Sequence, residues 1–188
     1  MELQQTIRIR RSIRSYTNKP IPQETIRTLL NAAVQAPSAM NSQPWAFAVI
    51  QNAAALKVLS DASKRYLVSS LTDASPLAKY RDLLSEPNFD VFYGASTLVL
   101  ILAKPNNPRP LEDCQLAAEN LMLAACDNGL GTCFIGFANI YLDTPAGKKE
   151  QGIPEDYQVA ATIVVGEPKE PLAPMDKKPP EVVFWKEA

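Results

Sequence analysis

Residues 96–103, STLVLILA, form a continuous apolar run between Gly94 and Pro105. A run of this length without polar alternation is typical of a β-strand that is buried on both faces of its sheet. Residues 158–166, QVAATIVVG, show the same character. Such strands need covering layers on both sides, and this requirement limits the folds that the chain can adopt.

The remaining elements are mixed in order and do not alternate as regular βαβ units. Helices are expected at residues 2–9, 22–35, 113–127 and 145–152, and further strands at 46–52 and 130–137. Asp113 is expected to open its helix, which is apolar on nearly every side and should lie in the middle of the molecule. Residues 53–85 are mostly helical in character but poorly patterned. This order favours an α+β fold in a single domain, residues 1–188.

Composition excludes several classes of function. The 188 residues include no histidine, so neither a Ser-His-Asp triad nor an HExxH metalloprotease helix can form from this chain. Nineteen basic and twenty acidic side chains leave no surplus of positive charge for nucleic acid or an anionic membrane. Three cysteines without a CxxC pair predict neither a disulfide framework nor a zinc ribbon, so no metal site is expected. With no signal-peptide pattern, a cytoplasmic location is expected.

The C-terminal segment, residues 167–188, reads as an extended arm. It has five prolines between residues 167 and 180, followed by the β-rich sequence EVVFW at 181–185. An arm of this kind cannot bury its own apolar end, so it should dock on a surface. The sheet edge of a partner subunit is one target, and a surface of the same chain is nearly as good.

Two polar clusters are candidates for ligand binding. Arg10, Arg11, Ser12 and Arg14 place three guanidinium groups within five residues, which suits a phosphate, although a solvated basic turn is the simpler interpretation. Ser38, Asn41, Ser42 and Gln43 precede Trp45, and their amides suit a heteroaromatic ring with alternating donors and acceptors. A capped surface loop explains this second cluster equally well.

Two further features are weaker by themselves. Residues 129–136, GLGTCFIG, look like a dinucleotide fingerprint but follow a helix instead of opening one, so the Rossmann context fails. Their glycines favour a helix cap and close approach of the main chain to a flat ligand. Lys177 and Lys178 form a basic pair in the proline-rich arm, which alone indicates a charged linker.

The order of these features is more specific than any one of them. RRSIRSY near the N-terminus, APSAMNSQPWAF, an alanine-rich helix leading into GLGTCFIG, and a basic pair before the final VV together resemble the nitroreductase family of FMN-dependent oxidoreductases. The resemblance spans essentially the whole chain. It implies a homodimer with a central, mostly antiparallel sheet flanked by helices, a C-terminal arm exchanged between subunits, and FMN at the subunit interface. Residues 53–93 would then be the variable helices that shape the substrate pocket.

The resemblance also implies a set of cofactor-binding residues. Arg10 would meet the FMN phosphate together with Lys177 and Lys178, and its neighbour Arg11 would also belong to the cofactor site. Ser12 and Arg14 would lie near the ribityl chain and the pyrimidine edge. Pro37, Ser38, Ala39, Asn41 and Gln43 would reach FMN from the opposite subunit, Asn88 would face the pyrimidine ring, and the main chain of Ile135 and Gly136 would face the reactive ring nitrogen.

The expected function follows from the cofactor. The resemblance implies an oxidoreductase in which FMN takes a hydride from NADH or NADPH and passes electrons to nitroaromatics, quinones or similar flat acceptors, so that no side chain need act as catalyst. Two alternatives stay open. One is a specialised enzyme on the same fold, such as a dehalogenase, a flavin-processing enzyme or a dehydrogenase, and the other is a flavin-binding dimer without turnover.

Overall fold

The computed structural model describes residues 1–170 and 173–187. The strands are β1 (Trp45–Ile50), β2 (Thr97–Ala103), β3 (Gly131–Phe134) and β4 (Gln158–Gly166). The helices are α1 (Leu3–Ile9), α2 (Gln23–Ala33), α3 (Ala53–Ser70), α4 (Arg81–Ser85), α5 (Pro110–Asp127), α6 (Gly136–Leu142) and α7 (Pro145–Gln151), with 3-10 turns η1 (Ala39–Asn41) and η2 (Ala78–Tyr80). In this part of the chain, no helix has the length and apolar character needed to cross a membrane.

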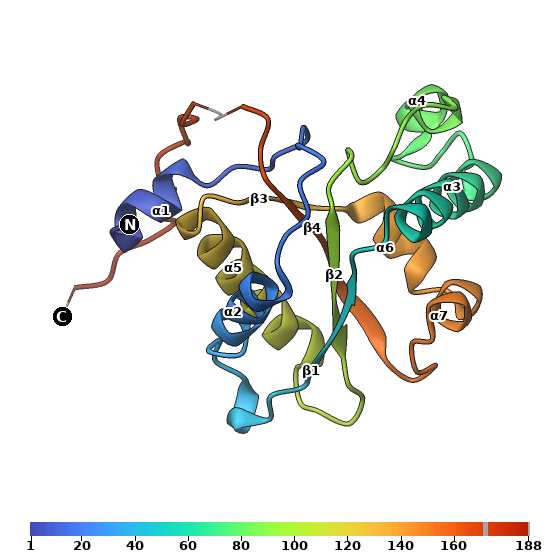
Figure 1. The fold of residues 1–188 in the computed structure, drawn as a ribbon. Helices are drawn as coiled ribbons and strands as arrows, with labels where there is room; N and C mark the ends of the chain where they lie inside the picture. The colour runs from blue at the N-terminus through green and yellow to red at the C-terminus, as the bar shows by residue number, and fades with distance from the viewer. Residues whose placement is uncertain (171–172, 188) are drawn as a thin grey trace.

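The four strands form one antiparallel sheet in the order β1-β2-β4-β3. Helices α2 and α5 cover one face of it, and α3 and α6 cover the other (Figure 1). This arrangement confirms the predicted α+β fold with a central antiparallel sheet flanked by helices. The two long apolar runs are the two central strands, which explains why they lack polar alternation.

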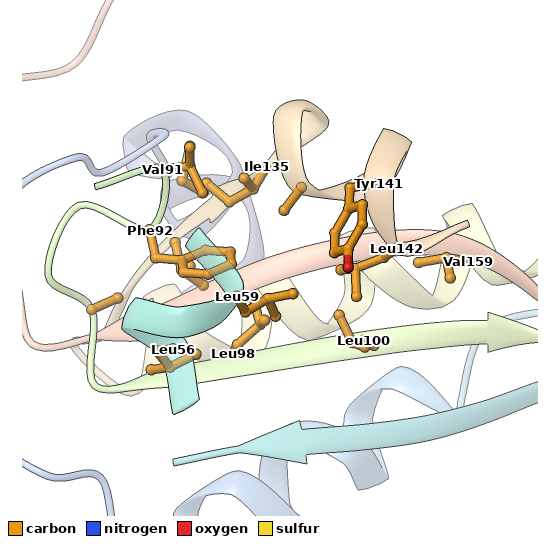
Figure 2. Close-up of a cluster of buried hydrophobic side chains, with 14 of the residues drawn as sticks. Leu56, Leu59, Val91, Phe92, Leu98, Leu100, Ile135, Tyr141, Leu142 and Val159 are labelled. Carbon is orange, nitrogen blue, oxygen red and sulfur yellow. The ribbon is translucent and has the colours of Figure 1, made fainter. Parts of the chain in front are cut away.

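Strand β2 divides its side chains between two hydrophobic cores. Leu98, Leu100 and Leu102 point into the core under α3 and α6, and alternate residues point into the core under α2 and α5. Every residue of β2 is buried. Figure 2 shows the first of these cores, where Leu98 and Leu100 lie with Leu59 of α3 and Leu142 of α6. The alternation follows from the period of two residues in a strand.

Three expectations about the C-terminal half are wrong in detail. Helix α5 begins at Pro110 and not at Asp113, because proline suits the first helical position. The same helix is not enclosed on all sides, since Leu116 is 48% exposed. Residues 181–187 form no strand, and the side chains from Val182 to Trp185 are exposed. In the described residues this segment lies unpaired, and an isolated extended segment is not stable as a strand.

Candidate functional site

The arginine-rich segment lies along the outer edge of β3. Ser12 forms a parallel bridge with Thr132, and the Ile13 N–H donates to the Thr132 carbonyl at 2.9 Å. Gly131 permits this approach, because a Cβ there would stand 2.7 Å from Cγ1 of Ile13. The buried Ile13 side chain anchors the segment, while Ser12 and Arg14 remain exposed on its outer side.

One end of the segment borders a small cavity of about 180 Å³. Arg10 Nε lies 3.2 Å from Oε1 of Glu119, but the geometry makes no hydrogen bond. Arg11 Nη1 donates to the Arg10 carbonyl at 2.8 Å, whereas its Nη2 is buried. Within residues 1–170 and 173–187, neither Arg10 Nε nor Arg11 Nη2 has a hydrogen-bond acceptor. Buried guanidinium N–H groups without acceptors suit an anionic ligand such as a phosphate.

The other end of the segment borders a larger cavity of about 730 Å³. Arg14 and Tyr93 line one side of it, and the Arg14 guanidinium carbon lies 6.0 Å from the centroid of the Tyr93 ring. Tyr80 and Phe137 pack edge to face at 5.4 Å on another side. A cavity with aromatic walls and one guanidinium group suits a flat ligand with an anionic or electron-rich edge.

The junction of β3 and α6 supplies main-chain groups to the same cavity. Ile135 and Gly136 both line it, but the Ile135 N–H already donates to the Thr162 carbonyl at 2.7 Å. The Ile135 side chain lies in the hydrophobic core beside Val91 (Figure 2). Gly136 is the first residue of α6, where an N–H has no partner inside its own helix. Of the two predicted residues, Gly136 therefore has the N–H that is available to a ligand.

The predicted loop at 37–43 lies apart from both cavities. Figure 1 places its turn η1 at the opposite end of the chain's fold from β3. The described lining of the two cavities contains no residue of this loop. The structure therefore brings together Arg10, Arg11, Ser12, Arg14, Ile135 and Gly136 around β3, and leaves Pro37, Ser38, Ala39, Asn41 and Gln43 elsewhere.

The remaining predicted residues lie outside the two cavities. Asn88 is exposed in the loop between α4 and β2 and is absent from the described linings. Lys177 and Lys178 are exposed in the arm. The arm does pass beside the arginine segment, since Arg11 Nε donates to the Ala173 carbonyl at 3.2 Å (Figure 1).

Sequence reasoning missed the aromatic wall of the larger cavity. Tyr80 and Tyr93 come from residues 53–93, where the hydropathy pattern is weak, and Phe137 lies one residue beyond the glycine-rich stretch. Gln115 of α5 also lines the cavity and donates to the Ala160 carbonyl at 2.5 Å. Another hollow, of about 600 Å³ beside α3 and α4, contains none of the predicted residues.

Comparison with known proteins identifies the fold that holds these groups. Residues 7–167 match the model of the nitroreductase family. The chain belongs to the nitroreductase family. This finding confirms the resemblance seen in the sequence and, with it, an oxidoreductase of the NAD(P)H-dependent flavin class.

Individual nitroreductases cover most of the chain. A protein of Archaeoglobus fulgidus, provisionally named NADH dehydrogenase/NAD(P)H nitroreductase, is 31% identical over 161 residues, 86% of this chain and 82% of its own. The crystal structure of a Bacteroides fragilis nitroreductase with bound FMN is 27% identical, with a TM-score of 0.84 and full coverage of both chains. An iodotyrosine deiodinase bound to FMN and 3-iodo-L-tyrosine is 22% identical with a TM-score of 0.74, a likeness that concerns the fold alone.

Proposed function

We propose that this nitroreductase binds FMN and uses NADH or NADPH to reduce nitroaromatics, quinones or similar flat acceptors. The observation that carries the proposal is the arginine segment along β3, which joins the small cavity at Arg10 and Arg11 to the larger cavity at Arg14. FMN has a phosphate at one end and a flat ring system at the other. The arginine segment has guanidinium groups at both ends, and the wide aromatic cavity lies at the Arg14 end. This arrangement fits the shape of FMN.

The residues around the small cavity fit the phosphate. Arg10 and Arg11 have buried N–H groups without acceptors in the described chain, and a phosphate oxygen would satisfy them. Lys177 and Lys178 follow Ala173, whose carbonyl already accepts a hydrogen bond from Arg11. We therefore assign the phosphate to these four side chains, and Ser12, between the two cavities, to the ribityl hydroxyls.

The residues around the larger cavity fit the ring. Bound FMN would supply reversible hydride and electron transfer, which this chain's side chains cannot perform. Arg14 provides a fixed positive charge, which stabilises negative charge on a bound ring. The Gly136 N–H is a donor at the helix start, and the aromatic side chains Tyr80, Tyr93 and Phe137 keep water away from a flat acceptor.

A homodimer would complete the site. The loop containing Pro37, Ser38, Ala39, Asn41 and Gln43 is remote from the cavities of its own chain, so we assign it to the site of a partner subunit. The outer edge of β1 is unpaired in residues 1–170 and 173–187, and the apolar segment 182–185 is exposed. An exchanged C-terminal arm would cover that edge in a second copy of the chain.

The visible spectrum of the purified protein tests the proposal. We expect a yellow protein, or one that turns yellow when FMN is added, and bleaching of the flavin bands when NADH or NADPH is added without oxygen. A nitroaromatic or quinone should then restore the bands. A colourless protein that takes up no FMN would contradict the proposal. Tight FMN binding without reduction would instead support a flavin-binding dimer without turnover.

A further inference from the structure

Asp113 connects α5 to the 37–43 loop. Asp113 is only 5% exposed, and its carboxylate accepts from the Ala39 N–H through both oxygens, at 3.1 and 3.2 Å. Ser42 Oγ lies 3.5 Å from one of these oxygens. A carboxylate is the side chain with the largest acceptor capacity, and here it is directed at the main chain of a loop far away in sequence.

The backbone of the 37–43 loop has an unfavourable conformation. Met40, Asn41 and Gln43 have φ values of 55°, 54° and 46°, a left-handed conformation that side chains other than glycine rarely adopt. Inside the loop, the Gln43 N–H donates to Ser38 Oγ at 3.0 Å. A residue in this conformation persists only where the surrounding structure enforces it. The bonds from Asp113 are a constraint on this turn from a different element of the fold.

Asp113 holds the loop by hydrogen bonds and not by ion pairing. In the part of the chain that the structure describes, no cation lies within ion-pair distance of its carboxylate. A buried carboxylate without a cation is a poor contributor to stability. Its presence is better explained by the loop shape that it enforces.

Helix α5 separates the loop from the cavity of its own chain. Gln115 lines the larger cavity, while Asp113, two residues earlier, faces the loop. Side chains two positions apart point to nearly opposite sides of a helix, at 3.6 residues per turn. The loop is thus held by the buried side of α5, away from the exposed side where Gln115 borders the cavity.

We propose that Asp113 is a positioning residue that fixes the 37–43 loop for contact with the FMN bound by the partner subunit. This inference rests on the proposed function. Asp113 does not touch the cofactor. It acts through Ala39 and Ser42, and its effect is exerted on the site of the other chain.

The first test compares variants at one turn of α5. Asp113→Ala should weaken FMN binding by about tenfold, because hydrogen bonds to a charged group are lost. Asp113→Asn keeps one acceptor for the Ala39 N–H and should restore most of the affinity. Glu112→Ala is the matched control, since Glu112 is an exposed neighbour that pairs with Arg109 at 3.2 Å. Thermal unfolding and sedimentation of each variant would verify that it remains a folded dimer.

The second test determines which subunit's FMN site loses affinity when Asp113 is replaced. Two differently tagged chains, one with Arg14→Glu and one with Asp113→Ala, are co-expressed and the mixed dimer is purified through both tags. If Asp113 acts on the partner's site, one of the two sites combines an intact Arg14 with an intact loop. That dimer should bind one FMN with wild-type affinity, whereas each homodimer variant binds weakly.

The outcomes separate the inference from the proposed function. A wild-type protein that binds no FMN overturns both. A wild-type protein that binds FMN, while Asp113→Ala keeps full affinity, overturns the inference alone. A mixed dimer that binds no more FMN than the homodimer variants also overturns it, since Asp113 would then act on the site of its own chain.

Discussion

The Arg14 guanidinium carbon lies 6.0 Å from the centroid of the Tyr93 ring, at the wall of the aromatic-lined cavity of about 730 Å³. Tyr93 reaches this position with a φ of 57°, which is unusual for a bulky side chain. Burial raises the pKa of the Tyr93 hydroxyl, so it stays protonated at neutral pH. Strained residues of this kind cluster at functional sites, and the ring orients the guanidinium group that the proposed function uses.

Replacing Tyr93 should therefore weaken cofactor binding. A cation–π contact of this length is worth about 0.5–1 kcal/mol at an exposed site, so Tyr93→Ala should raise the FMN dissociation constant about two- to fivefold. Tyr93→Phe keeps the ring face and should stay near the wild-type value. Fluorescence titration of the apoprotein with FMN measures both, and equal affinity for the Ala and Phe variants would contradict the assigned contact.

Gly131 should tolerate no side chain. A Cβ at this position would stand 2.7 Å from Ile13 Cγ1, and the buried Ile13 side chain would have to shift. We expect Gly131→Ala to lower the free energy of unfolding by about 1–3 kcal/mol. Gly136→Ala is the matched stability control, because a Cβ there meets no atom within 4 Å. Urea unfolding of both apoproteins is the measurement, and similar losses for the two variants would argue against the steric explanation.

Lys64 holds the loop that carries Asn88. Its buried ammonium group donates to the carbonyls of Phe89 at 2.7 Å and Glu86 at 3.1 Å. Lys64→Met leaves these acceptors unsatisfied and should cost about 1–3 kcal/mol. Lys57→Met on the same helix breaks an exposed pair with Asp61 and should cost at most about 0.5 kcal/mol. Hydrogen exchange should become faster at residues 86–91 in the first variant only, and unchanged exchange there would refute the role of Lys64.

Cys114 should make the fold sensitive to alkaline pH. Burial, with a smaller effect from the Asp113 carboxylate, raises the pKa of its thiol from 9.0 to about 12. Between pH 9.0 and 12 the folded state therefore keeps the thiol proton while the unfolded chain loses it. The free energy of unfolding has its full value below pH 9.0 and falls as the pH rises towards 12. Burial also raises the pKa of Tyr16, which adds to the same slope.

Cys114→Ala tests this dependence. The variant should lose stability at every pH because it leaves a small void, but the decline of its unfolding free energy between about pH 8 and pH 10.5 should be shallower than in the wild-type protein. Chemical unfolding at several pH values gives the two slopes. Parallel slopes would show that the thiol does not titrate as described.

Local sequence patterns were enough to predict the helices and strands near the core. Residues 96–103 and 158–166 are apolar throughout because helices cover both faces of their strands, and this character was visible without the fold. Thr144 caps α7 and Gly152 ends it in a left-handed conformation, as their residue types predict. The family resemblance came from the order of several weak motifs, and the comparison with known nitroreductases confirms it.

Asp113 shows what local patterns could not supply. Its residue type predicted a helix start, but Pro110 takes that place and the carboxylate instead accepts from Ala39, 74 positions away in the chain. Tyr93 and Phe137 likewise carry no pattern in sequence that would bring them to one cavity. The sequence by itself determined the strands, most helices and the family, because these depend on neighbouring residues and on burial. Only the tertiary structure decided which polar groups meet around β3 and which loop is turned away from them, because such contacts depend on how distant segments pack.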